Sequence, residues 1–258
     1  MGKIIAIHSY KGGTGKTLIS VNLASTYARK GRAVCLFDLD FRAPSLHAFF
    51  KADNVEHWLN DYLNGLCDIE KVLADFTPKN PGKGKLLVGL ANPSTEAIRE
   101  MSAKDRKWEM RALGRLLSLK NSLLNDMHTD YLILDTSPGL QYSSINAIVS
   151  ADTALVITGI DKSDIQGTQR MIQELYDLFE KKTAIIMNKV PCEVMPSKNQ
   201  AATLRNHFDM KHNLPILEVI PCSCDILSAG GTYIFTEEKP EHPFSKTLEK
   251  IASKIERF

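Results

Sequence analysis

The chain has 258 residues and a formal net charge of +2, with 43% hydrophobic and 24% charged residues. This composition is ordinary for a soluble globular protein. Because large α/β sheets reach about 250 residues as one unit, we expect a single domain over residues 1–258. A net charge this close to zero argues neither for nor against a nucleic-acid partner.

The five cysteines are odd in number and no signal peptide precedes them, which indicates the reducing cytoplasm rather than a disulfide framework. No apolar run approaches the roughly 20 residues that a membrane-spanning helix needs. We therefore expect a cytoplasmic protein without a membrane span.

Short apolar runs alternate with longer helical patterns along the chain. Runs typical of buried strands are found at residues 3–9, 33–40, 85–91, 130–135, 153–160, 183–190 and 216–222. Helices are predicted at residues 16–30, 94–126 (two helices), 162–182, 197–209 and 244–257. Most strand runs are continuous rather than alternating, which suits a parallel sheet covered on both faces. The predicted fold class is α/β, with a doubly wound, mostly parallel sheet and helices on both faces.

A glycine-rich segment, YKGGTGKT, follows the first predicted strand and opens the first predicted helix. Its glycines let backbone N–H groups converge on phosphate oxygens without a Cβ in the way. The helix points its positive end at the same charge. In this context Lys16 would reach the β- and γ-phosphates of a nucleotide, and the Thr17 hydroxyl would ligate Mg²⁺.

The run KGGTGKT resembles the deviant Walker A motif of the MinD/ParA/Mrp/nitrogenase-iron-protein group of P-loop ATPases, and the resemblance extends over nearly the whole chain. In that group a second lysine, here Lys11, precedes the glycine pair and crosses to the phosphates of a facing subunit. Valine is commoner in the group at the position of Thr14. The nucleotide-binding residues that the motif implies are Lys11, Gly12, Gly13, Thr14, Gly15, Lys16, Thr17 and Leu18.

The segment VCLFDLDFRAPSLHAFF (34–50) resembles switch I of the same group. The resemblance implies that Asp40 positions or polarises the attacking water and that Asp38 lies near the Mg²⁺ ion. Two carboxylates beside a divalent cation are reasonable because the metal offsets their repulsion. Taken alone, the pair is equally typical of residues that cap the following helix.

The segment YLILDTSPG (131–139) resembles the Walker B strand and switch II. The resemblance implies that Asp135 holds Mg²⁺, through water, and that the backbone N–H of Gly139 senses the γ-phosphate. In the same way, Asn188 matches the asparagine that hydrogen-bonds adenine, and Pro221 begins the loop that walls the base. The guanine-specific N-K-x-D pattern fails after Lys189, so adenine is favoured.

Cys222 and Cys224 are separated by one residue. Thiolates at this spacing can form half of a metal or iron–sulfur site that a second subunit completes. Cysteines at these positions can equally be packing residues.

Two surface features bear on partners. A locally basic zone could meet nonspecific DNA or be a solvated surface; it comprises Lys79, Lys83, Lys85, Lys104, Arg106, Lys107, Arg111 and Arg115. The last predicted helix carries its apolar residues on one face; they are Phe244, Leu248, Ile251, Ile255 and Phe258. Because the group places its last structural helix here, we expect this face to pack in the core and not to anchor the protein stably to a membrane.

The resemblance implies a cytoplasmic Mg²⁺-dependent ATPase whose catalytic residues are Lys11, Lys16 and Asp40. It would form a homodimer when ATP is bound and separate after hydrolysis, and the dimer would bind a protein partner, a surface or a cargo. Three alternatives remain open: a metal or iron–sulfur carrier that uses the cysteine pair, a partition motor that binds DNA nonspecifically, and a bacterial-type tyrosine kinase. The segment DLDFRAPSLH also resembles switch I of those kinases, whose tyrosine-rich tail has no counterpart after Tyr233.

Overall fold

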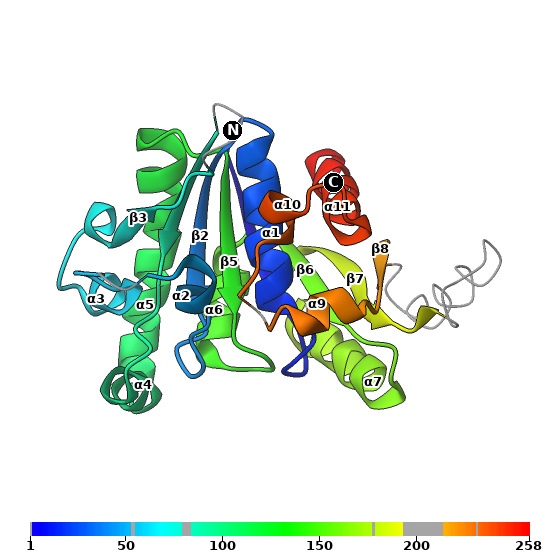
Figure 1. Cartoon of the computed structure of the whole chain (residues 1–258). Helices are drawn as coiled ribbons and strands as arrows, with labels where there is room; N and C mark the ends of the chain where they lie inside the picture. Colours follow the sequence, from blue (N-terminus) through cyan, green and yellow to red (C-terminus); the bar gives the residue numbers. More distant parts are fainter. Residues whose placement is uncertain (1, 53–54, 79–83, 177–178, 193–213, 231) are drawn as a thin grey trace.

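The computed structural model describes residues 2–52, 55–78, 84–176, 179–192, 214–230 and 232–258. Eight strands form one sheet in the order β3-β4-β2-β5-β1-β6-β7-β8 (Figure 1). Every neighbouring pair is parallel except β3 and β4. The strands are β1 (Lys3–His8), β2 (Ala33–Leu39), β3 (Leu73–Asp75), β4 (Lys85–Gly89), β5 (Tyr131–Thr136), β6 (Thr153–Thr158), β7 (Lys182–Val190) and β8 (Ile216–Pro221).

Successive side chains of the central strands enter two different cores. In β1, Ile4 and Ala6 belong to one hydrophobic cluster, whereas Ile5 and Ile7 belong to the other. Because side chains alternate along a strand, a strand that is buried on both faces must be apolar at every position. This explains the continuous apolar runs in the sequence and confirms the predicted fold class.

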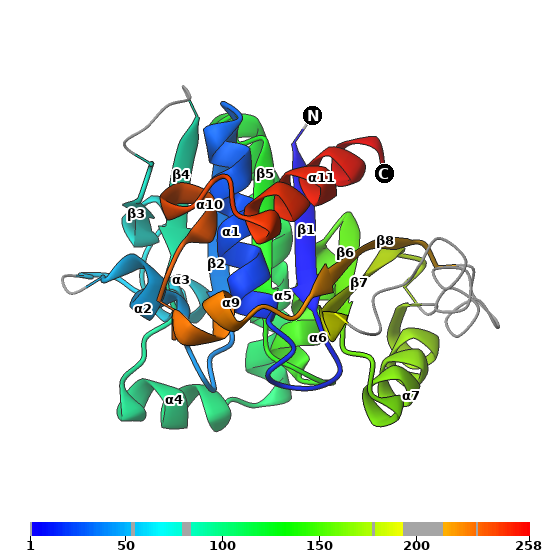
Figure 2. The ribbon, with the colours of Figure 1, turned by 45° about the vertical axis from the view of Figure 1, so that its right-hand side comes forward.

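Helices cover both faces of the sheet (Figures 1 and 2). The cluster on one face includes side chains of α1, α10 and α11, and the cluster on the other includes side chains of α5, α6 and α7. The helices are α1 (Lys16–Arg29), α2 (Leu46–Phe50), α3 (Leu59–Asn64), α4 (Thr95–Ser102), α5 (Arg106–Leu119), α6 (Tyr142–Ser150), α7 (Lys162–Met171), α9 (Cys224–Ser228), α10 (Phe235–Glu238) and α11 (Pro243–Arg257). A 3₁₀ turn (Ile69–Val72) and two π-helical turns (Lys120–Asp126 and Ile172–Tyr176) complete the described elements.

The seven predicted strands are all present, and residues 94–126 contain the two predicted helices, α4 and α5. Five shorter helices (α2, α3, α6, α9 and α10) and the antiparallel edge strand β3 were not predicted from the sequence. Helices of one or two turns contain too few residues to establish a 3.6-residue period. The helix predicted at 197–209 lies outside the described residues.

The parallel arrangement brings distant segments to one edge of the sheet. The loop after β1, the segments after β2 and β5, and the end of β7 all leave the sheet at its carboxyl edge. Ligands of open α/β sheets bind at this edge, outside the ends of the strands. The topology therefore brings predicted site residues to one edge, although Lys11 and Asn188 lie 177 positions apart along the chain.

The C-terminal helix α11 packs on α1 and β8. Its residues Phe244, Leu248, Ile251 and Ile255 are at most 3% exposed, in agreement with the expected core packing. None of the helices in the described ranges combines the length and hydrophobicity that crossing a bilayer requires.

Replacing Leu248 by alanine should leave a cavity between α11 and α1. We expect this change to lower the free energy of unfolding by about 2–5 kcal/mol, as for other fully buried leucines. Lys250→Ala, at an exposed position of the same helix, should change it by less than about 0.5 kcal/mol. Urea denaturation of the two variants and the wild type measures the difference, and equal stabilities would show that α11 does not contribute to the core.

Candidate nucleotide-binding site

The loop of residues 9–15 joins β1 to α1, and two of its glycines have left-handed backbone conformations. Gly13 has a φ of 75°, and Gly15, directly before α1, has a φ of 93°. An added Cβ on Gly15 would collide with the carboxamide of Asn188. Because other side chains are strained at such φ values, glycines are required for the chain to turn directly into the helix.

Two side chains from the end of β7 hold this loop. The Asn188 carboxamide donates to the carbonyl oxygen of Thr14 at 2.8 Å, and the Lys189 ammonium donates to that of Gly13 at 2.7 Å. Lys189 itself has a left-handed φ of 58°. These hydrogen bonds satisfy two carbonyls of the loop and attach it to the end of β7.

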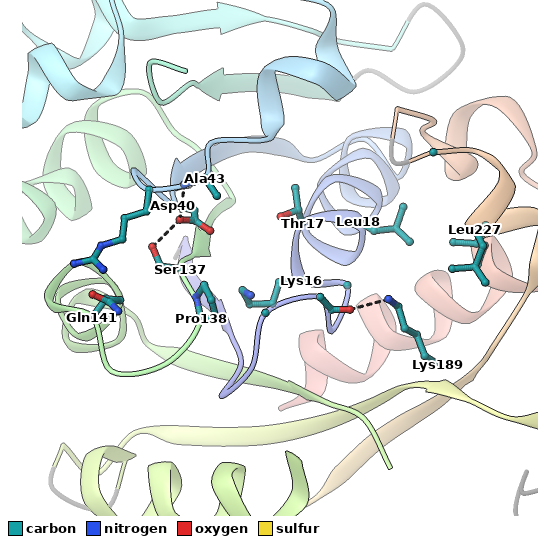
Figure 3. A pocket seen from close by; sticks show the side chains of 16 residues that line it. Lys16, Thr17, Leu18, Asp40, Ala43, Ser137, Pro138, Gln141, Lys189 and Leu227 are labelled. Carbon is teal, nitrogen blue, oxygen red and sulfur yellow. Dashed lines mark hydrogen bonds between the residues drawn. The ribbon is translucent and has the colours of Figure 1, made fainter. Parts of the chain in front are cut away.

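A pocket of about 550 Å³ lies beside the loop (Figure 3). The loop, the start of α1, the segments after β2 and β5, Lys189 and the region of α9 contribute its walls. The predicted site residues that line it are Gly12, Gly13, Gly15, Lys16, Thr17, Leu18 and Asp40. The predicted residues outside its lining are Lys11, Thr14, Asp38, Asp135, Gly139, Asn188 and Pro221.

Lys16 supplies a buried cation to the pocket. The residue is 7% exposed, and its Nζ donates to the Ser9 hydroxyl at 3.0 Å. Burial lowers the pKa of Lys16, and the carboxylates of Asp135, Asp40 and Asp164 act in the opposite direction. A buried ammonium beside a helix N-terminus is suited to binding an anion.

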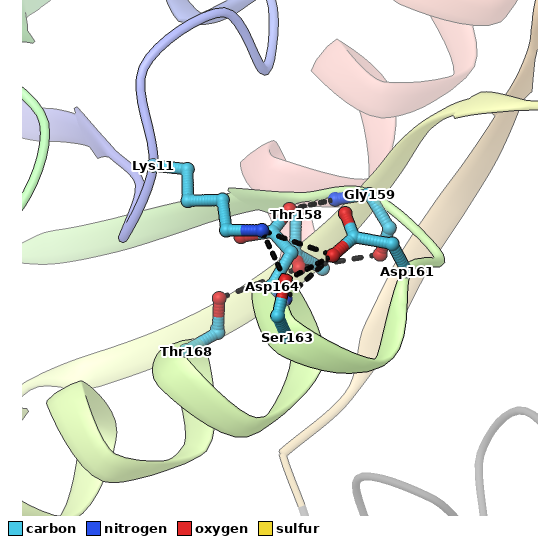
Figure 4. Close-up of polar contacts among 7 residues, drawn as sticks. All are labelled: Lys11, Thr158, Gly159, Asp161, Ser163, Asp164 and Thr168. Atoms are coloured by element: carbon cyan, nitrogen blue, oxygen red, sulfur yellow. Dashed lines mark hydrogen bonds and ion pairs between the residues drawn. The ribbon is translucent and has the colours of Figure 1, made fainter.

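Lys11 points away from this pocket, toward the first turn of α7 (Figure 4). Its Nζ lies 3.0 Å from a carboxylate oxygen of Asp161 and also donates to the Ser163 hydroxyl. The Ser163 and Lys11 hydrogen bonds lower the pKa of Asp161. The two lysines of the loop thus have different surroundings, one buried at the pocket and one in a surface ion pair.

A smaller cavity of about 260 Å³ adjoins the same loop. Lys11, Thr14 and Asn188 line it, together with Asp164. Thr14 is 8% exposed, and its hydroxyl has no hydrogen-bond partner within the described ranges. Lys11, Thr14 and Asn188 therefore line this smaller cavity and not the pocket of about 550 Å³.

Asp38 is a helix cap in this structure. It is fully buried, and its carboxylate accepts hydrogen bonds from the backbone N–H groups of Asp40, Ser45 and Leu46 at 3.1–3.2 Å. Burial, reinforced by the nearby Asp135, raises the pKa of Asp38 well above its usual range. One carboxylate oxygen accepts the N–H of Asp40, and the other accepts those of Ser45 and Leu46 at the start of α2, so Asp38 supports the segment that follows β2. Its expected place near the metal stays a prediction.

Asp40 lies on the pocket wall, as its predicted role requires. Its Oδ1 accepts the backbone N–H of Ala43 at 3.2 Å and the Ser137 hydroxyl at 3.0 Å. The two aspartates of D-L-D thus differ: one organises the segment after β2, and the other faces the pocket.

Asp135 and Thr17 have oxygen atoms suited to a hard cation. Asp135 is fully buried, and its Oδ1 accepts the Ser20 hydroxyl at 2.9 Å, whereas Oδ2 has no hydrogen-bond partner in the described part of the chain. Burial raises the pKa of Asp135 to about 6, against the effect of the Thr17 and Ser20 hydroxyls. Thr17 lines the pocket and accepts a hydrogen bond from the Ser45 hydroxyl at 3.3 Å.

An unpartnered buried carboxylate oxygen near a threonine hydroxyl fits Mg²⁺, which binds through few protein ligands and keeps substrate oxygens and waters. Within the described residues, no three His, Cys, Asp or Glu side chains are arranged to hold an ion by themselves. The site is therefore suited to a metal that arrives with its phosphate ligand.

Gly139 ties the segment after β5 to the loop. Its N–H donates to the carbonyl oxygen of Ser9 at 2.9 Å, and its own carbonyl accepts from Nε2 of His8 at 2.8 Å. The N–H group expected to sense the γ-phosphate is therefore engaged in this conformation, and it becomes available only if the Ser9 hydrogen bond opens.

The region after β8 forms the apolar part of the pocket wall. Pro221 ends β8 outside the lining, and Ile226 and Leu227 of α9 line the pocket instead. The segment that begins at Pro221 therefore reaches the pocket through α9, and its expected role beside the base stays a prediction. Asn188, expected to contact adenine, is 5% exposed and donates to the loop.

The cysteine pair lies at the start of α9. Cys222 is half-buried and Cys224 is exposed. The structure adds a third cysteine that the sequence analysis had not associated with them, because Cys192 Sγ lies 3.8 Å from the carbonyl oxygen of Cys222. The three thiols do not form a metal-binding group among the described residues.

Only part of the predicted basic zone can be described. Lys79 and Lys83 lie outside the described residues, and Lys104 pairs with Glu100 at 2.6 Å. The Arg115 guanidinium lies over the Tyr62 ring. Some of this positive charge is therefore used within the chain.

The loop, the lysine pair and the aspartates at the strand ends are those of a P-loop protein of the MinD/ParA type. Residues 2–190 match the AAA_31 family, an AAA domain, and the chain belongs to this family.

The relatives extend over most of the chain. The septum site-determining protein MinD of Thermotoga maritima is 29% identical, with 99% of this chain and 88% of the relative covered. The tyrosine-protein kinase CpsD of Streptococcus pneumoniae is 28% identical over 74% of this chain and 78% of the relative. The structure of MinD with Mg-ADP from Pyrococcus horikoshii superposes with a TM-score of 0.78, at 24% identity, covering 100% of this chain and 97% of the other. This likeness confirms the fold.

Protonation of His8 should destabilise the protein in acid. Burial lowers the pKa of His8 from 6.5 to about 4, with Lys16 adding to the effect and the Gly139 hydrogen bond opposing it. The native state then binds fewer protons than the unfolded state, so the free energy of unfolding falls as the pH drops from about 6.5 to about 4.

Between pH 7.5 and pH 5, His8 should account for a loss of about 2 kcal/mol. Urea denaturation of the wild type and of His8→Gln at both pH values measures it. The wild type should lose more stability than the variant; equal losses would contradict the assignment.

Proposed function

We propose that the protein is an Mg²⁺-dependent ATPase that dimerises when it binds ATP, and that its dimer positions or partitions a partner, surface or cargo. The observation that carries this proposal is the pocket of about 550 Å³ into which the glycine loop, Lys16, Thr17 and Asp40 converge. The five free cysteines of the chain agree with the cytoplasm as the proposed compartment.

Phosphate binding is assigned to the loop and the start of α1. The N–H groups of residues 12–17 would contact the phosphate oxygens, and Lys16 would offset their charge. The hydrogen bonds that hold the carbonyls of Gly13 and Thr14 support this assignment because they fix the conformation of the loop. The Mg-ADP named for the Pyrococcus horikoshii protein supports a magnesium nucleotide as the ligand.

Thr17 and Asp135 would hold the metal, Asp135 through a water molecule. When bound, Mg²⁺ would offset negative charge on the phosphate groups. Asp38 would contribute indirectly, because it fixes Ser45, whose hydroxyl donates to Thr17.

The nucleobase is assigned to the far side of the pocket from Asp40. Leu18, Ile226 and Leu227 offer apolar surface there, and Lys189 offers a polar edge. We propose adenine as the base, because the chain lacks the N-K-x-D aspartate that reads guanine. Asn188 uses one N–H of its carboxamide on the Thr14 carbonyl, which would leave its second N–H and its carbonyl oxygen for adenine.

Lys11 is assigned to the dimer. Lys11 does not line the pocket of its own chain, and this supports a role in contacting a second subunit that covers the pocket. In a face-to-face dimer it would reach the phosphates of the other subunit and offset charge that develops during transfer. The Asp161 contact is exposed, and such pairs stabilise by about 1 kcal/mol or less, so dimerisation can replace it.

Asp40→Ala should separate binding from hydrolysis. Without a carboxylate to orient water, kcat should fall by about 10²–10⁴-fold, while the affinities for ATP and Mg²⁺ stay close to those of the wild type. The variant should accumulate as an ATP-bound dimer. Phosphate-release kinetics and sedimentation measure these effects, and normal turnover would remove Asp40 from the mechanism.

The two lysines of the loop should fail at different steps. Lys11→Ala should bind ATP, yet neither dimerise nor hydrolyse it, with a loss of about 10³–10⁵-fold in rate. Lys16→Ala should already fail to bind ATP. Sedimentation with a nonhydrolysable ATP analogue tests this order, and a Lys11→Ala protein that dimerises and turns over normally would contradict the crossing-lysine assignment.

A second candidate function is protein tyrosine phosphorylation. The relative named as a tyrosine-protein kinase and the segment DLDFRAPSLH favour it. Incubation with labelled ATP, followed by phosphotyrosine detection on the chain and on added protein, distinguishes transfer to tyrosine from transfer to water. Label on tyrosine that disappears in Lys16→Ala would establish protein tyrosine kinase activity.

A further inference from the structure

Ser137 connects the two segments that flank the Asp40 end of the pocket. Its hydroxyl donates to Asp40 Oδ1 at 3.0 Å, across 97 positions of sequence (Figure 3). Ser137 is 1% exposed and lines the pocket. The contact joins the segment after β2 to the segment after β5.

The hydrogen bonds of Asp40 leave one carboxylate oxygen available. Both the Ala43 N–H and the Ser137 hydroxyl donate to Oδ1. No donor in the described ranges reaches Oδ2 at hydrogen-bond distance. Two donors on one oxygen restrict rotation of the carboxylate, and the other oxygen can then accept a hydrogen bond from water.

The backbone around Ser137 is held independently of Asp40. Its carbonyl oxygen accepts the Thr136 hydroxyl at 3.2 Å and the Ser144 hydroxyl at 2.7 Å. Two residues later, Gly139 donates to the carbonyl of Ser9 in the glycine loop. The Ser137 hydroxyl thus ties Asp40 to a segment that is itself bonded to the loop.

We propose that Ser137 is a positioning residue for ATP hydrolysis, which orients Asp40 Oδ2 toward the attacking water and couples it to the loop through residues 137–139. The inference rests on the proposed function. If Ser137 had a purely structural role, its buried hydroxyl would need only some hydrogen-bond acceptor. The carbonyl oxygen of Leu39, at 3.4 Å, could serve as that acceptor in place of Asp40.

The test compares two equally buried hydroxyls. Ser137→Ala removes the donor to Asp40, whereas Ser245→Ala removes a donor to the backbone carbonyl of Lys239, and both side chains are 1% exposed. One lost hydrogen bond to a charged group corresponds to about 10-fold or more in rate. We expect kcat of Ser137→Ala to fall by about 10–100-fold with ATP affinity unchanged, and kcat of Ser245→Ala, which does not line the pocket, to change by less than about threefold.

A double-mutant cycle isolates the route through Asp40. If Ser137 acts only on that carboxylate, Ser137→Ala should cause no further loss of kcat in the Asp40→Ala background, because coupled residues are not additive. Ser137→Thr, which keeps a hydroxyl, should recover most of the activity. Circular dichroism and binding of a fluorescent ATP analogue establish that each variant is folded.

The outcomes separate this inference from the proposed function. A wild type that does not hydrolyse ATP with Mg²⁺ overturns the proposed function and this inference together. A wild type that hydrolyses ATP overturns the positioning role alone if Ser245→Ala is as slow as Ser137→Ala, or if the losses of Ser137→Ala and Asp40→Ala add in the double variant.

Discussion

The attachment of the glycine loop to the end of β7 is the constraint on which the site depends. Asn188 and Lys189 fix the orientation of the loop because their side chains donate hydrogen bonds to the carbonyls of Thr14 and Gly13, respectively. With those carbonyls satisfied, the loop is held at the N-terminus of α1, where backbone N–H groups can bind an anion. At Gly15 the left-handed φ of 93° would strain any other residue, and an added Cβ would also displace the Asn188 carboxamide. An anion site of this kind is thus supported from a strand that lies two places away in the sheet, beyond β6.

Aspartates in similar sequence contexts differ in burial and in hydrogen-bond partners, because the fold places them in different environments. Asp38 and Asp40 are two positions apart, yet one is buried among backbone N–H groups and the other lines the pocket. Asp135 is buried as well, but it keeps an oxygen without a partner in the described part of the chain. Burial disfavours the charged form of a carboxylate unless donors or cations compensate. A metal with its phosphate ligand would supply such compensation to Asp135, whereas Asp38 already has its donors.

The fold class was predictable from the sequence because strands buried on both faces must be continuously apolar, and seven such runs are present. The glycine spacing of the loop was equally informative, since left-handed φ values at Gly13 and Gly15 restrict those positions to glycine. The shorter helices α2, α6 and α9 were not predicted. They are defined by the surfaces they pack against rather than by a repeating pattern of their own.

Sequence by itself therefore determined the residue types of the site, namely two lysines, a threonine and aspartates at strand ends. Only the tertiary structure decided which of them share the pocket and which support it from outside. The contacts of Lys11 with Asp161, of Asn188 with Thr14 and of Ser137 with Asp40 join segments between 97 and 174 positions apart. No local pattern encodes such pairs, because the register and order of parallel strands place them side by side.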